Sequence, residues 1–492
     1  MPWVSDPLEQ TKIAFALSSA AIGPVFGTFG TYVSYQLQYI GYAIGANPGQ
    51  PLGTGCLDLS QSCRVPFGSG NVNLTSLILY LNAIAFALSG ALCLLVSGVG
   101  DYMGWKREQY IVLVICYGAF ALPVASMTAY NLETFNSYCG LSVVFNTVGF
   151  LAGAWQNIYI PDVMHGDTAS LVSEKAESRR EREIRGVNTS VWGFNAYYAS
   201  LIVFYCITIG ITFVSPTAAT QAGLWVTTAS AALCIVLAAV AWPFLPSPRA
   251  KALPPGVSLS KVPFITLVEL WRACTKYRQC IFYLVGFVIY NDSVFAFSAV
   301  IGQLFNLQLR PSILEFTYYS IVGTGTSIVA PTIFMYLFRY TKFLSLRSWT
   351  VFAYSLIAFT CFWCCIGFSD NAKIGFKHRW EFYLFQVITN IAYGLMPSIF
   401  RVLYCELFPK GAEVQYFSFQ LAISCATVWI PQVVDSFTVD ATNLVRLPAA
   451  VALAMMLVAI GFTLGTNVER GIVAVKQAEV AERDELEPDL KD

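Results

Sequence analysis

Long apolar runs separated by short polar stretches make up most of the chain. A helix that crosses the roughly 30 Å hydrocarbon core of a bilayer needs about 20 mostly apolar residues, and about twelve segments meet that requirement. They begin near Lys12, Leu74, Gln109, Thr134, Val187, Gln221, Cys280, Leu314, Ser348, Trp380, Val414 and Leu447. The pattern therefore predicts an all-α integral membrane protein whose surroundings are the lipid bilayer.

A polar connection at residues 247–278 divides the predicted spans into two equal groups. Its proline-rich start and the later amphipathic stretch from Leu267 to Trp271 predict a linker followed by an interfacial helix. We expect four parts in chain order, an N-terminal six-helix half (1–246), a cytosolic linker (247–278), a C-terminal six-helix half (279–470) and an acidic cytosolic tail (471–492). The tail is predicted to be disordered from Glu479 onward. Two six-helix halves are the plan of a major-facilitator transporter.

Composition supports the membrane assignment and excludes other classes of protein. Hydrophobic residues make up 56% of the chain and charged residues 12%, against roughly 25% charged residues in soluble domains. Lys plus Arg and Asp plus Glu both number 29, so no net field draws the chain to nucleic acid. His165 and His378 are too few for a His-based metal site, and no phosphate-binding loop is present in the sequence. We therefore expect no cofactor, no metal and no enzymatic activity.

The distribution of basic residues predicts the orientation in the membrane. If the N-terminus is cytosolic, the connections on its side carry about 22 of the 29 Lys and Arg residues, as the positive-inside rule requires. The opposite orientation would contradict this rule in nearly every loop. Both termini are therefore predicted to be cytosolic.

The first loop on the opposite side, residues 41–72, carries Cys56 and Cys63 outside any predicted span. An oxidising compartment would let the two cysteines form a disulfide, and two free thiols are the alternative. Asn73 begins an acceptor sequence for N-glycosylation, Asn73-Leu74-Thr75, which directly precedes the second span. Both sites are expected on the non-cytosolic side, and because Asn73 abuts the span, a modified and an unmodified Asn73 are both left open by the sequence.

The connection after the fourth span contains a mixed run of acidic and basic residues from Glu174 to Glu183. Opposite charges three and four residues apart are typical of a short helix with a solvated face. A regulatory contact with another part of the chain is the alternative interpretation.

The sharpest motif joins the second and third spans. Gly98, Asp101, Gly104, Lys106 and Arg107 resemble the cytosolic loop signature of major-facilitator transporters. The glycines permit a tight turn between helices, and Asp101 is placed to contact a helix end or a basic partner in the other half. We expect this segment to bias the inward–outward equilibrium, and an ordinary polar turn is the alternative.

Two ionisable residues lie within predicted spans, where a buried charge is costly and therefore indicates function. Asp292 is near the middle of the seventh span, beside Tyr290 and Asn291, which would line a polar path. We expect Asp292 to carry a proton, with a purely structural carboxylate as the alternative. Arg401 lies near the cytosolic end of the tenth span and is expected to hold a substrate carboxylate or to act in gating, unless its side chain only reaches to the interface.

Uncharged polar residues in the spans give weaker signals. The candidates for the proton and substrate path are Gln156, Asn157, Asn195 and Asn390. Such residues more often form hydrogen bonds between helices than contacts with a ligand.

Several segments resemble the autophagy-related protein 22-like vacuolar effluxers of the major facilitator superfamily. The segment from Gln156 to Asp162 is similar to the end of that family's fourth span, and Tyr290-Asn291-Asp292 matches its seventh-span pattern. The most specific stretch runs from Ser398 to Arg401 and continues through the Pro-x-Gly-x-Glu segment that ends at Glu413. In the fifth span, Asn195 and Tyr197 replace small residues of the family pattern.

The resemblance implies a multi-pass vacuolar membrane protein that releases amino acids, such as leucine, from degraded cargo to the cytosol. Protons are the expected coupling partner because the vacuole lumen is acidic. Two alternatives remain open from the sequence. One is a non-transporting receptor or scaffold with a transporter fold, and the other is a facilitator for another small solute such as a sugar or a lipid.

Overall fold

The computed structural model describes residues 7–56, 63–68, 70–103, 105–165, 179–215, 219–246, 258, 261–309, 311–341, 344–369, 371–409, 413–442 and 446–486. In its N-terminal part the elements are α1 (Pro7–Thr28), the π-helix η1 (Phe29–Val33), α2 (Ser34–Ile44), β1 (Arg64–Phe67), β2 (Gly70–Asn73), α3 (Leu74–Met103), α4 (Lys106–Ala121), the 3-10 helix η2 (Leu122–Ser126), α5 (Leu132–Gln156), α6 (Tyr159–His165), α7 (Arg179–Val214), α8 (Ala219–Ala241) and the 3-10 helix η4 (Trp242–Phe244). In its C-terminal part they are α9 (Val262–Lys276), α10 (Arg278–Leu309), α11 (Ile313–Tyr340), α12 (Leu346–Ile366), α13 (Arg379–Cys405), α14 (Glu413–Thr427), α15 (Trp429–Thr442), α16 (Pro448–Gly465) and α17 (Val468–Leu486).

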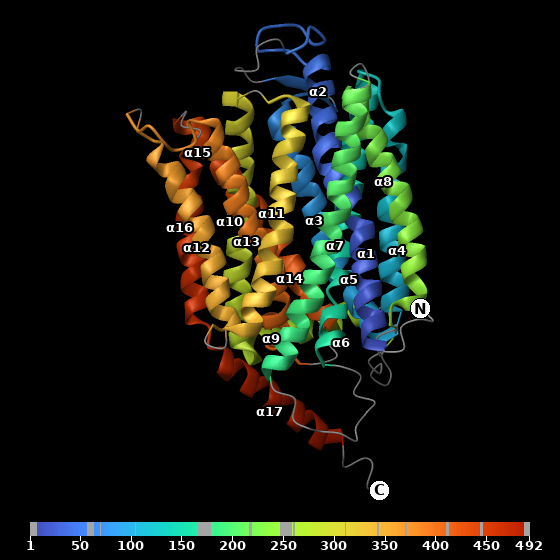
Figure 1. Ribbon diagram of the computed structural model, residues 1–492. Coiled ribbons are helices and arrows are strands. Elements are labelled where there is room, and N and C mark those ends of the chain that lie inside the picture. Colours follow the sequence, from blue (N-terminus) through green and yellow to red (C-terminus); the bar gives the residue numbers. More distant parts are fainter. Residues whose placement is uncertain are drawn as a thin grey trace.

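The long helices form a single bundle that runs between two ends (Figure 1). Eleven helical segments of the described chain are long and apolar enough to cross a membrane, and the apolar part of α3, Tyr80–Val96, is a shorter one. The prediction of an all-α membrane protein with about twelve spans is confirmed.

The two ends of the bundle carry different structures. α1 starts at the same end of the bundle as α17, and we call this end the α17 end (Figure 1). At the opposite end, called the hairpin end, β1 and β2 pair antiparallel, and a disulfide joins Cys56 to Cys63 with their Cα atoms 5.7 Å apart. The first described helix therefore starts, and the last described helix lies, at the same end of the bundle, as an even number of spans requires.

Short polar side chains begin several helices by accepting hydrogen bonds from free backbone N–H groups. Asn131 Oδ1 accepts from the Thr134 N–H at 2.8 Å where α5 starts. Ser312 Oγ accepts from the Glu315 N–H at 3.2 Å where α11 starts. These contacts supply partners that the first turn of a helix lacks.

The first and the eleventh predicted spans are interrupted rather than straight. The π-helical η1 separates α1 from α2 within the first span. Val428 separates α14 from α15, shortly before Pro431, whose ring removes a backbone N–H from the helix. Interruptions of this kind in membrane helices are tolerated where protein surrounds them.

Helices of the two predicted halves pack directly against each other. α7 lies along α11, and α3 lies along α14. Within the N-terminal part α1 and α7 approach closely, because a Cβ atom added to Gly23 would lie 2.3 Å from the Tyr197 carbonyl oxygen. The division into halves at residues 246 and 279 remains a prediction.

The linker and the tail differ in how much of them the structure describes. Residues 247–257, 259 and 260 lie outside the described part, whereas α9 is a helix that exposes Phe264 and Trp271. The prediction that the tail is disordered from Glu479 is wrong as far as Leu486, where α17 ends. Ala, Glu and Arg in this stretch are good helix formers, which explains the extension. Residues 487–492 lie outside the described residues.

Candidate functional site between the helices

Arg401 is a cation at the junction of α13 with the N-terminal helices. Its Nη1 donates to Ser190 Oγ at a long 3.5 Å, and its guanidinium carbon lies 5.1 Å from the centroid of the Phe194 ring, both on α7. The hydroxyls of Tyr110 and Tyr198 are close enough to interact with it electrostatically. Among the described residues no carboxylate forms an ion pair with Arg401. A guanidinium held in this way is available to bind an anionic group.

The polar residues predicted to line a path are held in place by hydrogen bonds between helices. Gln156 Nε2 at the end of α5 donates to Ser19 Oγ of α1 at 2.7 Å. Asn195 Nδ2 of α7 donates to Thr332 Oγ1 of α11 at 2.8 Å, which joins the two predicted halves.

The oxygen atoms of the amides in this set differ in whether they have a partner. Asn390 Oδ1 of α13 accepts from Ser327 Oγ of α11 at 3.0 Å. The Oδ1 atoms of Asn157 and Asn195 are buried without a hydrogen-bond partner in the described structure. Unpaired buried oxygens of this kind favour a ligand that donates hydrogen bonds.

Asp292 is buried in α10 on the side that faces α14, with 3% of its surface exposed. Its carboxyl lies beside the side chains of Thr427 and Cys425, and its Oδ1 has no hydrogen-bond partner among the described residues. The neighbouring Ser293 donates to the Ala452 carbonyl of α16 at 3.0 Å. Asp292 therefore contacts neither Arg401 nor the α7 residues around it, and it forms a second, separate polar position.

The side chain of Tyr290, two positions before Asp292, points elsewhere. The Tyr290 ring stacks on Tyr354 of α12 with centroids 4.4 Å apart, and its buried hydroxyl has no partner within the described residues. Asn291 is half-buried. The structure thus places Tyr290 among the C-terminal helices and not beside Arg401.

At the α17 end, two arginines of α7 that the sequence suggested would be solvated contact the other predicted half. Arg180 donates to the Phe338 carbonyl and, at 2.9 Å, to the Thr341 carbonyl at the C-terminus of α11. Arg182 forms a 3.3 Å ion pair with Glu406, which follows α13. The prediction of a solvated face is therefore wrong for Arg180 and Arg182, whose side chains join the two predicted halves, whereas Glu181 is exposed. Residues 174–178 lie outside the described part.

The loop motif between α3 and α4 is described only in part. Gly98 and Asp101 belong to α3, but the side chain of Asp101 and the whole of Gly104 lie outside the described residues. Lys106 is buried, and Arg107 pairs with the adjacent Glu108 at 2.6 Å. The gating role of this motif remains a prediction.

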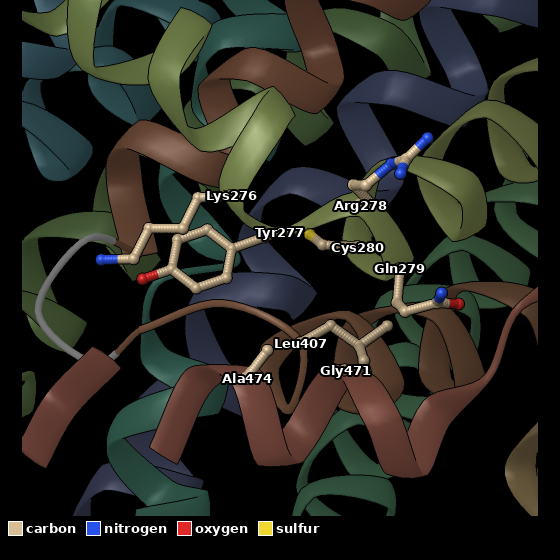
Figure 2. Close-up of a pocket in the computed structure, with 8 residues that line it drawn as sticks. All are labelled: Lys276, Tyr277, Arg278, Gln279, Cys280, Leu407, Gly471 and Ala474. Atoms are coloured by element: carbon tan, nitrogen blue, oxygen red, sulfur yellow. The ribbon is translucent and has the colours of Figure 1, made fainter. Parts of the chain in front are cut away.

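A small cavity of about 140 Å³ lies at the α17 end, between the start of α10, Leu407 and α17 (Figure 2). Lys276 and Arg278 border it, but Figure 2 shows their charged ends pointing to opposite sides. Because the two charges do not converge, this cavity lacks the arrangement of a substrate site. Within the described residues no cluster of His, Cys, Asp or Glu is placed to hold a metal ion.

Two buried carboxylates of functional or structural interest were not predicted from the sequence. Asp435 in α15 is 7% exposed, and its Oδ1 has no partner in the described structure. It lies about 20 residues into the eleventh predicted span, at the edge where a carboxylate is expected to meet water. Glu381 at the start of α13 accepts several backbone hydrogen bonds. Glu381 lies three residues after the N-cap His378, and a Glu at this capping-box spacing was the available signal.

A family model described as "Vacuole effluxer Atg22 like" matches residues 11–476. The chain belongs to this Atg22-like family of vacuole effluxers. Autophagy-related protein 22 of Candida albicans is 26% identical over 453 residues, which cover 91% of this chain and 86% of the relative. Autophagy-related protein 22 of Yarrowia lipolytica is 26% identical over 220 residues, or 44% of this chain and 36% of the relative.

The fold of this Atg22-like chain is that of the major facilitator superfamily. The proton:xylose symporter XylE bound to 6-bromo-6-deoxy-D-glucose superimposes with a TM-score of 0.63 at 10% identity, covering 93% of this chain and 95% of that one. The human organic anion transporter MFSD10 (TETRAN) superimposes with a TM-score of 0.57 at 12% identity, covering 93% and 100%. At these identities the likeness concerns the fold alone. The Atg22-like chain is therefore a membrane transporter of the vacuole effluxer family.

Proposed function

We propose that this Atg22-like transporter exports neutral amino acids, such as leucine, from the vacuole lumen to the cytosol by alternating access. The α17 end would face the cytosol, as the positive-inside distribution of Lys and Arg predicts. The two predicted halves would rock about the polar positions that lie between them.

The observation that carries the proposal is the position of Arg401. A guanidinium without a carboxylate partner among the described residues, held by Ser190, Phe194 and tyrosine side chains, suits the carboxylate of a substrate. The aromatic surroundings would favour an apolar side chain next to that carboxylate. A free amino acid with a neutral side chain combines both features.

Proton coupling is a further part of the proposal. A buried carboxylate with an unpaired oxygen, as at Asp292, is a group that can hold a proton during transport. Protons moving from the acidic lumen to the cytosol would then drive the substrate in the same direction. Asp292 and Arg401 occupy separate positions, so proton and substrate would be bound at different places.

The test is uptake of a labelled amino-acid panel into proteoliposomes, with and without an imposed pH gradient. We expect gradient-dependent accumulation of neutral amino acids. The Arg401→Gln variant should have a KM for the amino acid about tenfold higher than that of the wild type, because one charge-assisted hydrogen bond to the substrate carboxylate is lost. Arg401→Lys should recover part of this affinity.

The matched control is Arg339→Gln, an exposed arginine near the end of α11. This variant should transport as the wild type does. Uptake of sugars or lipids in place of amino acids would replace the proposed substrate class. The absence of any uptake by folded protein would favour a receptor or scaffold.

A further inference from the structure

Two buried carboxylates of the C-terminal helices have no charge partner in the part of the chain that the structure describes. Asp292 on α10 is 3% exposed and Asp435 on α15 is 7% exposed, and each has an Oδ1 without a hydrogen-bond partner. No Lys, Arg or His of the described chain forms an ion pair with either. An ionised carboxylate buried in this way is strongly disfavoured, so each needs a proton or a bound cation.

Both carboxylates belong to one region around the break in the eleventh span. Asp292 faces Thr427, the last residue of α14, and the helix restarts at Trp429. Asp435 lies about 12 Å farther along the same span, eight residues at 1.5 Å each, toward the hairpin end. α15 packs on α10 and α16, so Asp435 is enclosed by these helices rather than by lipid.

The break frees backbone and side-chain oxygens beside Asp292. Pro431 has no N–H, so the Thr427 carbonyl lacks the helical partner that an ordinary residue would supply four positions later. The Thr427 hydroxyl lies 3.1 Å from the Ile423 carbonyl, to which it donates. The same hydroxyl lies beside the Asp292 carboxyl, so Asp292 has one hydroxyl neighbour at the break.

The surroundings favour a proton over a metal cation. Asp292 is offered one hydroxyl and the thiol of Cys425, whereas hard metal cations take about six or more oxygen ligands. The titratable groups near Asp292 are Cys425 of α14 and, behind it, Cys93 of α3. In the described part of α10, α15 and α16, no titratable group interacts with Asp435.

We propose that Asp435 and Asp292 form a two-carboxylate proton relay across the break between α14 and α15. Asp435 takes a proton from the hairpin end. Its O–H bond then breaks as the proton passes through water to the Asp292 carboxylate, where a new O–H bond forms. Release from Asp292 toward the α17 end restores both carboxylates. The inference rests on the proton coupling proposed above and adds Asp435 and the break to it.

The first experiment follows the carboxyls directly and needs no substrate. Infrared difference spectra of the full-length protein in nanodiscs are recorded across a pH titration. Wild-type protein should show two protonated-carboxyl bands, of which Asp435→Asn and Asp292→Asn each remove one. Glu133→Gln, at an exposed position in the first turn of α5, is the control and should remove neither.

The second experiment separates a relay from a structural role. In proteoliposomes, Asp435→Asn should lower gradient-driven amino-acid uptake by at least about tenfold. Exchange of labelled for unlabelled substrate at equal pH on both sides should continue, because it needs no net proton movement. Loss of both activities, with folding intact, would overturn the relay in favour of a structural role.

The remaining outcomes are also decisive. Retention of both bands in Asp435→Asn would overturn the relay. Stabilisation by Na⁺ but not K⁺, abolished in Asp292→Asn, would overturn it in favour of a metal-ion site. If each variant removes its own band as expected but the wild-type protein transports no amino acid, the relay stands and the proposed substrate class fails.

Discussion

At the scale of single residues, the structure uses one carboxylate to shape a loop at the hairpin end. Glu381 Oε2 accepts from Trp363 Nε1 at 2.7 Å and from the N–H groups of Gly375 and Phe376 at 2.6 and 2.7 Å. Its Oε1 accepts from two further backbone N–H groups. Phe376 has a φ of 60°, a left-handed conformation that is rare for a bulky residue and that these contacts support.

We predict that Glu381→Gln destabilises the protein by about 3 kcal/mol. An amide keeps one accepting oxygen and directs an NH₂ group at N–H donors, so several buried donors lose their partner. Thermal unfolding in detergent measures the effect. Glu133→Gln is again the control, and equal melting temperatures for the two variants would contradict the prediction.

A second prediction at this scale concerns the close approach of α1 and α7. Gly23→Ala should destabilise the fold by about 2 kcal/mol, since its Cβ would lie 2.3 Å from the Tyr197 carbonyl oxygen, which is backbone and cannot rotate away. Gly153→Ala in α5 is the matched change, because its Cβ would meet no atom within 4 Å. Thermal unfolding should show a loss for the first variant and no loss for the second.

At the scale of elements, α7 ties the two predicted halves together at the α17 end. Arg180 caps the C-terminus of α11, whose free carbonyls carry the negative end of the helix dipole, and its guanidinium lies 3.6 Å from the centroid of the Phe338 ring. The Arg182–Glu406 pair adds a second contact. The helices below are tightly packed, since a Cβ on Gly186 would lie 2.9 Å from Val402. These contacts must break for the α17 end to open.

We predict that Arg180→Gln shifts the transporter toward a state that is open at the α17 end. A cysteine placed at Val402 should then react faster with a membrane-impermeant thiol reagent added from that side. Arg339→Gln in the same cysteine background should leave the rate unchanged. An unchanged rate in Arg180→Gln would show that this contact does not hold the end closed.

The ion pair between α7 and the end of α13 is tested by exchanging the charges. Arg182→Glu and Glu406→Arg should each speed labelling at position 402, and the double variant should restore the slow rate. If the two changes raise the labelling rate additively in the double variant, the ion pair does not itself hold this end closed.

At the scale of the whole molecule, the sequence predicts the bundle because span length and apolar composition are local properties. The same local reasoning treats the charges from Glu174 to Glu183 as solvated, since nothing nearby in sequence shows that α11 and α13 lie opposite. Asp435 is missed for a related reason, as its burial depends on α10 and α16. Arg401 and Asp292 are singled out correctly as charges within spans, but their separation depends on how the helices pack.

The covalently tied loop at the hairpin end has a consequence for the survival of the protein. Cys56 is bonded to Cys63, the Cys56 N–H donates to the Tyr42 carbonyl at 2.8 Å, and the Leu74 N–H donates to the Cys63 carbonyl at 2.8 Å. The proposed orientation places this loop in a compartment that digests its contents. A protease cleaves where it can draw an extended stretch of chain into its active site. A loop fastened at both of its bases and paired in a hairpin resists this, so the transporter would outlast the proteins whose breakdown products it carries.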